Sequence, residues 1–306
     1  MNYIELSQAI QSYAENTESL FVQSIPTFIQ EAEDRIYNSV QLASLRKNVT
    51  GTMTIGNKYV SLPDDWLANY SVAVIDNTGN YTYLLNKDVN YLREAYPNPN
   101  STAIPKYYAL FGSQYNDLNE LSLMMAPTPD NYYGVELHYY YYPVSIVQGQ
   151  LLQLTNIVAG TGYTNGTYYN VPLVGGSGAN ATATFVVISS FVSSVTINNS
   201  GSLYLVGDTL TVSASNLGGS GAGFSVTVAS IVNPTGTSWL GDNYDPVLFY
   251  GAMREAMIFM KGEADMVGYY EQKYQEALAQ LKRLGDGLER NDAYRKGQTS
   301  LEYKGL

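Results

Sequence analysis

The residues that could carry covalent chemistry are few, and they do not form a set. The chain has one histidine, His138, and no cysteine. A Ser-His-Asp triad or a multi-histidine metal site would depend on that single side chain, while thiolate zinc sites, iron–sulfur clusters and thiol nucleophiles require cysteine. The sequence therefore predicts no catalytic residue, no metal site and no cofactor, and it indicates a protein that is not an enzyme.

Other patterns resemble sites only superficially. Carboxylates are paired at Asp64/Asp65, Glu33/Asp34 and Asp242/Asp245, as a glycosidase would need, but helix capping or solvation is the favoured interpretation of all three. The segment 160–166 is glycine-rich, yet it has no lysine and no following helix, so it does not predict a phosphate loop. We interpret the Gly-Gly-Ser-Gly-Ala runs at 175–179 and 218–222 as β-turns in which glycine supplies a positive φ.

Composition excludes further classes of function. The net charge is −11, which argues against binding nucleic acid through its phosphates. We expect no signal peptide and no membrane span, because no apolar run is long enough to cross a bilayer. Tyrosine is in excess, with 29 in the chain, and suits wet protein interfaces. The run Tyr139–Tyr142 places rings on both faces of a predicted strand, so the strand is either covered on both sides or exposes one face at an interface.

A neutral module interrupts an ordinary charged chain. Between Gln148 and Gly236 the only charged residue is Asp208, and 14 of the 27 glycines lie there. Gly160-x-x-Tyr163-x-x-Gly166 recurs as Gly201-x-x-Tyr204-x-x-Gly207, and each copy precedes one Gly-Gly-Ser-Gly-Ala run and a β-branched segment. Two packed copies of a β unit predict a small sandwich or barrel. A low-complexity linker is disfavoured, because 195–197 and 210–212 alternate as strands do.

The residues before the module predict an α+β arrangement. We expect a short helix over 4–14 and a longer one capped by Ser24, with Pro26 in its first turn and Arg46 and Lys47 at its end. A helix over 86–96 is also predicted, stopped by the prolines at 97 and 99. Strands are expected at 49–55, 58–62, 71–76, 81–85, 105–111, 120–125 and 135–142. The last three of these are predicted to form an antiparallel meander.

The residues after the module predict two helices. Asp245 is the expected cap and Pro246 the first residue of a helix ending at Met260, with a break at Gly262. A second helix runs from Glu263 to about Leu284, ended by Gly285 and Gly287. Its apolar residues are spaced three and four apart, as in an inter-helix seam: Val267, Tyr270, Tyr274, Ala277, Leu281, Leu284 and Leu288. A hairpin onto the preceding helix is favoured over packing on another subunit.

Several motifs of the outer segments together resemble the head-to-tail adaptor (connector) family of tailed phages. In chain order, the motifs are Phe28-x-x-x-Ala32-Glu33-x-Arg35-Ile36, Leu62-Pro63-Asp64-Asp65-Trp66, Pro105-Lys106-Tyr107-Tyr108-Ala109, Ala126-Pro127-Thr128-Pro129, the strand ending at Pro143, Ser238-Trp239-Leu240, Asp245-Pro246-x-Leu248-x-Tyr250-Gly251-Ala252-x-x-Glu255-Ala256, and Tyr274-x-x-Ala277-Leu278-x-x-Leu281. The resemblance covers about 1–147 and 237–290, and the neutral module is an insertion.

The resemblance implies a fold and a division of the chain. It implies an α+β protein: a helical adaptor body with a small antiparallel sheet, plus an inserted all-β sandwich or barrel. The predicted parts are 1–147 (N-terminal part of the body), 148–236 (inserted module), 237–290 (C-terminal helices of the body) and 291–306. The last part is an exposed C-terminal arm, with Tyr294, Leu301 and Tyr303 as the residues that would anchor it to a portal protein.

The resemblance also implies a role and partners. Such proteins form a homo-oligomeric ring, commonly a dodecamer, that joins the portal to the tail or nozzle and extends the DNA channel. DNA would pass without specific binding, since negative walls repel phosphates. The expected location is the virion neck, after assembly in the host cytoplasm and without contact to a membrane. A capsid or fibre contact through the insertion is a further possibility. The alternative function is a tail component that binds a receptor or glycan through the inserted module.

Overall fold

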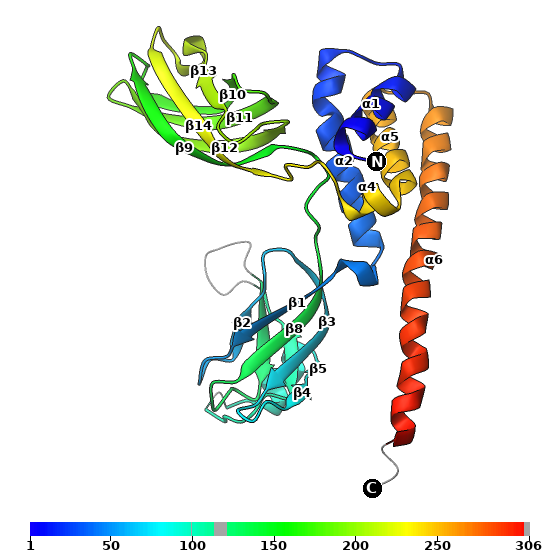
Figure 1. Ribbon diagram of the computed structural model, residues 1–306. Coiled ribbons are helices and arrows are strands. Elements are labelled where there is room, and N and C mark those ends of the chain that lie inside the picture. Colours follow the sequence, from blue (N-terminus) through cyan, green and yellow to red (C-terminus); the bar gives the residue numbers. More distant parts are fainter. Residues whose placement is uncertain (99, 113–120, 303–306) are drawn as a thin grey trace. The chain divides into compact units, whose positions relative to one another are not determined.

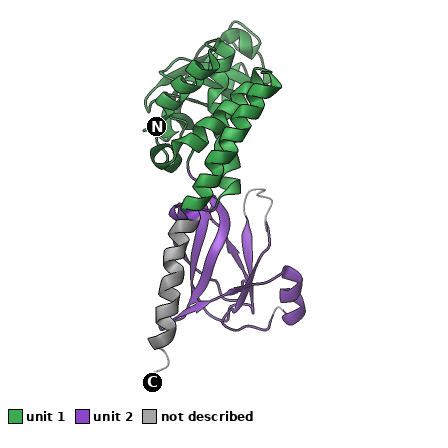
Figure 2. Ribbon diagram, turned by 90° about the vertical axis from the view of Figure 1, so that its right-hand side faces the viewer, with its two compact units in different colours: residues 1–40, 144–284 green, residues 41–143, 285–306 purple. Residues whose placement is uncertain are grey.

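The computed structural model describes the backbone of residues 1–98, 100–112 and 121–302, and the side chains of these ranges up to residue 285. The described residues form six α-helices and three β-sheets (Figure 1), a mixed α+β protein as predicted. Two compact units are present (Figure 2): unit 1 contains residues 1–40 and 144–284, and unit 2 contains residues 41–143 and 285–306. The predicted boundaries at 147, 236 and 290 stay predictions.

Helices from both ends of the chain build one part of unit 1. They are α1 (Tyr3–Ala14), α2 (Ser19–Ser39), α4 (Trp239–Asn243), α5 (Asp245–Phe259) and the first part of α6 (Ala264–Glu302). Asn2 and Glu5 form a capping box that starts α1. The buried side chains of α2 and α5 face each other across a shared core, which includes Ile25, Ile29, Val247 and Ala252. The N-terminal and C-terminal segments therefore fold together.

Three predicted helix boundaries are wrong. The helix α2 begins at Ser19, so Ser24 and Pro26 lie within it. The hydroxyl of Ser24 donates to the Leu20 carbonyl and does not cap the helix. It ends at Ser39, so Arg46 and Lys47 belong to a strand. Asp245 is the first helical residue of α5 and does not cap it. The predicted break at Gly262 is present.

The predicted end of the last helix is also wrong. The backbone of α6 continues through Gly285 and Gly287 to Glu302. A glycine in a helix interior costs only about 1 kcal/mol relative to alanine, so two glycines weaken a long helix without ending it. The residues predicted as a weakly structured tail are thus helical as far as Glu302.

The neutral module forms a nearly closed six-stranded barrel, as the repeat predicts. Its strands are β9 (Gln150–Thr161), β10 (Gly166–Val174), β11 (Ala179–Ile188), β12 (Phe191–Ser202), β13 (Thr209–Val212) and β14 (Ala222–Val232), with η2 (Ala214–Leu217) between the last two. The sheet order is β12-β11-β10-β13-β14-β9, and its two end strands lie against each other. The amides of Leu203 and Tyr204 donate to the carbonyls of Gln148 and Gly149, which helps to close the barrel.

Unit 2 is built on two four-stranded sheets. One has the order β1-β8-β3-β4 and contains β1 (Arg46–Thr52), β8 (Gly134–Tyr141), β3 (Trp66–Ile75) and β4 (Tyr81–Tyr83). The other has the order β2-β7-β6-β5 and contains β2 (Tyr59–Ser61), β7 (Ser122–Ala126), β6 (Tyr107–Leu110) and β5 (Leu85–Asn86). Helix α3 (Val89–Ala95) packs on β6, and η1 (Ala43–Leu45) precedes β1.

The predicted meander is wrong in one strand. Strands β6 and β7 pair antiparallel as expected, but β8 pairs with β1 and β3 in the other sheet. Pairing between neighbours in sequence was the basis of the prediction, whereas here the inward side chains of β8 close a core between the two sheets. That core consists of Met53, Leu62, Val72, Val74, Leu84, Tyr108, Leu123, Met125, Val135, Leu137 and Tyr139.

Candidate functional site

The described residues bring no catalytic set together. They contain no group of three or more His, Asp or Glu that could hold a metal ion. His138 lies on β8 with its ring 5.0 Å from that of Tyr70. Of the paired carboxylates, Asp65 is engaged by neighbouring side chains and Glu33 is buried, so the expectation of a capping or solvated role is wrong for Glu33. The candidate sites are therefore contacts that hold elements together and surfaces that could meet a partner.

A charge network joins α2, α5 and α6. The Arg35 guanidinium lies 2.7 Å from a Glu255 carboxylate oxygen, and Arg254 lies 2.7 Å from the same oxygen. Arg254 also pairs with Glu271 of α6. Hydrogen bonding from Gln275, together with Arg254 and Arg35, outweighs the effect of burial and holds the pKa of Glu271 below its usual value. The network fixes the three helices relative to one another.

The seam residue Tyr274 packs inside the same network. Its side chain is fully buried, its ring lies under the Arg35 guanidinium at 5.8 Å, and burial raises its pKa to about 12. A Cβ atom added at Gly251 of α5 would lie 3.3 Å from this ring. The glycine therefore lets α6 approach α5 within one chain.

The side chains of the other seam residues differ in how exposed they are. Tyr270, Ala277 and Leu281 are buried, Val267 is half-buried, and Leu284 is 43% exposed. The side chains of Leu288 and of the arm residues Tyr294 and Leu301 lie outside the described residues, as does Tyr303 entirely. Helix–helix packing within the chain thus uses the middle of the predicted seam, and contact with another subunit stays a prediction.

A second polar node lies in unit 2, at the Leu62–Trp66 motif. The Asp65 carboxylate accepts hydrogen bonds from Lys47 at 2.5 Å and from the Tyr139 hydroxyl at 2.8 Å. Partial burial acts to raise the pKa of Asp65, but these two partners outweigh it and hold the pKa below the usual value. Burial and the same carboxylate raise the pKa of Tyr139 to about 12. The node ties β1 and β8 to the loop before β3.

The tyrosine run is covered on both faces. Tyr139 points into the core between the sheets, whereas the hydroxyl of Tyr140, on the opposite face, accepts a hydrogen bond from Arg46 at 2.7 Å. The Arg46 guanidinium also lies 3.8 Å from the centre of the Tyr70 ring, a cation–π contact. Of the two alternatives for this run, the described contacts favour a strand packed on both sides.

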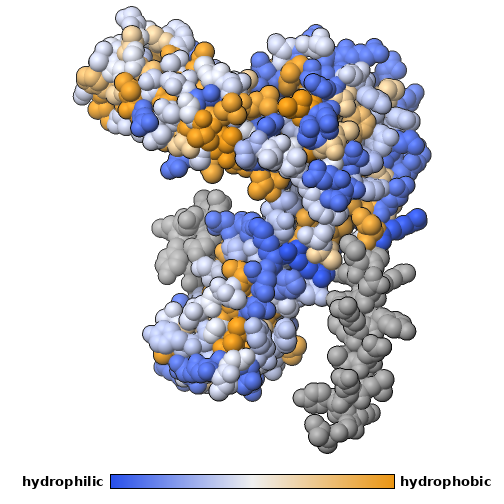
Figure 3. Space-filling model, in the orientation of Figure 1, coloured by the Kyte–Doolittle hydropathy of each residue, from blue (hydrophilic) through white to orange (hydrophobic). Residues whose placement is uncertain are grey.

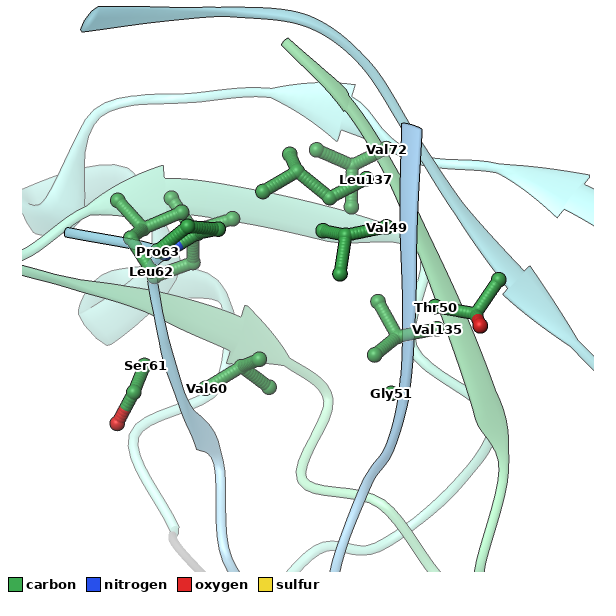
Figure 4. Close-up of a pocket in the computed structure, with 11 residues that line it drawn as sticks. Val49, Thr50, Gly51, Val60, Ser61, Leu62, Pro63, Val72, Val135 and Leu137 are labelled. Carbon is green, nitrogen blue, oxygen red and sulfur yellow. The ribbon is translucent and has the colours of Figure 1, made fainter. Parts of the chain in front are cut away.

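An apolar cavity of about 380 Å³ opens between the two sheets of unit 2. It lies between β1 and β2, which are edge strands of their sheets. Figure 4 shows Val49, Val135 and Leu137 on the side of one sheet and Val60 and Leu62 on the side of the other. The lining offers little beyond methyl groups and the hydroxyls of Thr50 and Ser61. Such a lining suits an apolar group.

The repeated tyrosines and glycines hold the two copies of the barrel together. Tyr163 of the first copy packs on Gly221 of the second, and its hydroxyl accepts the Phe224 amide at 3.1 Å. Tyr204 of the second copy packs on Gly178 of the first, and its hydroxyl accepts the Ala181 amide at 3.4 Å. Neither glycine has a positive φ. The turn interpretation is wrong for these two positions, because they are glycine to make room for a ring.

The two copies differ in the loop around each tyrosine. The first copy has Gly162, Thr164 and Asn165, and the second has Leu203, Leu205 and Val206 at the corresponding positions. These three apolar residues are 41, 56 and 62% exposed, and Leu203 has a φ of 65°. Asp208, the single charge of the module, accepts the Leu205 amide at 2.9 Å. Figure 3 shows the barrel surface with little blue compared with the helices.

Two groups of ionisable side chains that hold elements together were not predicted from the sequence: Glu33, which is 2% exposed, and the Arg254–Glu271 pair, whose side chains are 23 and 37% exposed. Glu33 follows Ile25 and Ile29 at intervals of four, so it lies on the buried stripe of α2, and this spacing was the signal available. Arg254 and Glu271 flank an apolar helix–helix contact, and no spacing within either helix indicates that they meet. The Arg254–Glu271 pair becomes visible only when α5 and α6 are brought together.

One comparison with known proteins gives a match. The family profile described as SU10 adaptor protein matches residues 1–169, more than half of the chain. This match defines the class of the protein: a structural adaptor of phage particles. The chain belongs to the SU10 adaptor protein family. No curated protein sequence matches the chain, and none of the helices in the described residues is long and apolar enough to cross a membrane.

Proposed function

We propose that the protein forms a ring in the phage neck, which joins the portal to the tail and extends the DNA channel. The observation that carries this proposal is the family match over residues 1–169. The C-terminal helices lie outside the matched range, so their resemblance to adaptors is part of the proposal. The ring is expected to be a dodecamer, with the portal on one side and a tail or nozzle protein on the other.

The fold supports an assembly role. The Arg35–Glu255 pair and the buried Tyr274 tie α2 to the C-terminal helices, so segments from the two ends of the sequence make one folded body. Exposed apolar side chains remain on the helices of unit 1, such as Tyr13 of α1, Leu20 of α2 and Tyr269 of α6, at 65, 64 and 51% exposure. Exposed large apolar groups of this kind fit burial between subunits.

The arm of residues 291–306 is the proposed portal contact. Tyr294, Leu301 and Tyr303 would supply apolar area to the contact with the portal. The net charge of −11 suits a channel wall that does not hold passing DNA, because like charges repel. The virion neck is the proposed location, and the protein would assemble there after synthesis in the host cytoplasm.

The decisive experiment combines the full chain with the portal of the same phage and images the complex by electron microscopy. We expect a ring of twelve copies stacked on the portal. The triple substitution Tyr294→Ala, Leu301→Ala, Tyr303→Ala should lose binding, whereas the matched control Asn291→Ala, Gln298→Ala should keep it. If the full chain and the portal do not associate, the proposed function is wrong.

A receptor or glycan contact through the barrel is the second candidate, and the divergent loop of the repeat favours it. Leu203, Leu205 and Val206 leave apolar area exposed where the other copy has small or polar residues. The amide of Gly149 donates to the carbonyls of Val232 and Asn233, so the ends of the module are adjacent. Residues 150–232 can therefore be replaced by a short Gly-Ser linker.

This deletion separates the two functions. Under the first proposal, particles carrying the deletion assemble complete necks, seen by microscopy. Under the second, such particles still assemble but no longer adsorb to host cells. Adsorption at the wild-type level would exclude the receptor function, and loss of necks would show that the barrel itself is needed for assembly.

A further inference from the structure

Glu33 is a buried carboxyl group in unit 1, beside the point where the chain returns to that unit. It lies on α2 and is 2% exposed. Its Oε1 atom accepts the amide of Ile146 at 2.9 Å. Ile146 belongs to the segment Val144–Gln148, which we call the strap; it is the first part of the chain to re-enter unit 1 after unit 2. Glu33 therefore holds one of the places where the chain passes from one unit to the other.

The strap makes several other contacts besides the one to Glu33. The side chains of Ile146 and Val147 are fully buried, and Gly241 leaves room for Ile146, since an added Cβ atom would lie 2.7 Å from it. Asn233 donates to the carbonyl of Ser145 at 2.7 Å.

At the end of the strap, the Gln148 carbonyl accepts the Leu203 amide at 2.7 Å and the Gln148 side chain donates to the Pro234 carbonyl at 2.8 Å. Local opening therefore concerns Val144–Val147, which can leave α2 while Gln148 stays bound and the helices stay folded.

The environment of Glu33 favours its protonated form. Burial raises the pKa of Glu33 from 4.5 to about 7; hydrogen bonds from Ser145 and Ile146 oppose this, and the neighbouring charge of Asp34 adds to it. The nearby cations are engaged elsewhere: Arg35 pairs with Glu255 of α5 and Glu271 of α6, and the N-terminal ammonium donates to the Gly241 carbonyl. No cation of the described network compensates the Glu33 carboxylate.

We propose that Glu33 is a proton-dependent latch: the strap is held closed on α2 while the Glu33 carboxyl is protonated, and it opens more readily once this group ionises. Opening lets water reach the carboxylate and frees about four residues between the units, a gain in tether length of roughly 13 Å. The inference concerns the single chain and does not depend on ring assembly.

The direction of the effect follows from the two states. In the open strap Glu33 is solvated and has an ordinary pKa, whereas in the closed strap the pKa is about 7. The extra stability of the closed strap is fully present below pH about 4.5 and is lost as the pH rises to about 7. Between pH 5 and 7.5 the opening equilibrium should increase by roughly 50-fold.

Hydrogen exchange of the full chain tests the latch. Peptides that cover residues 143–148 are followed by mass spectrometry between pH 5 and 7.5, with each rate corrected for the intrinsic pH dependence of amide exchange. In the wild type, protection of the strap should fall by roughly 50-fold over this range. In Glu33→Gln, which keeps an oxygen acceptor for Ile146 and cannot ionise, the corrected protection should be constant.

Two further variants distinguish the proposed pH effect from a general destabilisation of the strap. Ile146→Ala should increase exchange at every pH without changing the pH dependence, because it removes apolar contact and leaves Glu33 in place. Glu31→Gln alters an exposed carboxylate on the same helix and should behave as the wild type. A pH-independent strap in the wild type, or the same pH dependence in Glu33→Gln, would overturn the proposal.

Discussion

The barrel and the helices of unit 1 are stabilised by opposite means. The barrel contains one charged residue, and its tyrosines pack directly on glycine backbone. The helices are held by a network in which Arg35, Arg254, Glu255 and Glu271 share contacts. Close packing does not depend on the ionic environment, whereas ion pairs that solvent can reach are weakened by salt. The inserted module and the helices that carry it are therefore expected to respond to different perturbations.

The strongest test of this contrast removes the barrel tyrosines. Tyr163→Ala and Tyr204→Ala should each lower the free energy of unfolding of the barrel by about 3–5 kcal/mol, because a large buried ring leaves a cavity. Segment-resolved hydrogen exchange of the full chain would show faster exchange in 150–232 and unchanged exchange in α2 and α5.

The matching Tyr→Phe variants serve as controls for the two alanine variants. Each loses only the hydrogen bond from the Phe224 or Ala181 amide and should cost about 1 kcal/mol. Similar losses at both tyrosines would show that the copies are equivalent in energy as well as in geometry. A negligible effect of either alanine variant would contradict the proposed role of that tyrosine in barrel stability.

The next effect comes from the glycines opposite these rings. A Cβ atom at Gly178 would lie 2.5 Å from the Tyr204 ring, and one at Gly221 would lie within 2.7 Å of the Tyr163 ring. Gly178→Ala and Gly221→Ala should destabilise the barrel by about 1–3 kcal/mol through overpacking. This loss of barrel stability is measured by hydrogen exchange at increasing denaturant concentrations. Gly51→Ala, whose added Cβ would meet Val135 at an ordinary 3.5 Å, is the control and should leave the barrel unchanged.

These tyrosine–glycine contacts also show what the sequence could and could not predict. Alternating β-branched residues and a repeated glycine–tyrosine pattern were sufficient for a folded two-copy β unit. The exchange of partners between copies was not predictable, because Tyr163 and Gly221 are far apart in the sequence and no local rule relates them. Likewise, the local pattern of β8 predicted a strand correctly, but its sheet was decided by the core around Leu137 and Tyr139.

Predictions for α2 failed at both ends, and at its start the reason is tertiary packing. Ser24 and Pro26 together are typical of a helix start, but the apolar residues Phe21 and Ile25 are buried on the same face as Ile29. Burial of that longer stripe extends the helix to Ser19 and outweighs the cost of an internal proline. Helix type was thus predictable from the sequence, whereas the helix ends depended on tertiary packing.

On the helical side, Arg35→Met should destabilise the helices by about 1–2 kcal/mol, less than the loss of a fully buried pair, because solvent screens the partly exposed guanidinium. The substitution keeps the apolar stem and removes a partner of Glu255, whose side chain is 11% exposed. The barrel should be unchanged. The loss should shrink in high salt, measured as exchange in α2, α5 and α6.

The control for Arg35 is a pair whose carboxylate is exposed: the Glu276 side chain is 49% exposed, whereas that of Glu255 is 11% exposed. Lys273 contacts Glu276 three residues later at 3.0 Å on the surface of α6. Lys273→Met should have no measurable effect on exchange in any helix, because such surface pairs contribute little. An equal loss from Lys273→Met and Arg35→Met would show that burial of the carboxylate partner does not strengthen the Arg35 pair.

The smallest expected effect distinguishes a glycine that makes room for a neighbouring group from a glycine that no contact requires. Gly268 lies in α6, has no neighbour within 4 Å of an added Cβ, and has no positive φ. Gly268→Ala should therefore stabilise the helical part by about 0.5–1 kcal/mol through backbone entropy, the opposite sign to Gly178→Ala. Slower exchange in the first turns of α6 is the expected result. Destabilisation at Gly268 would mean that α6 needs a glycine there for a contact outside the single chain.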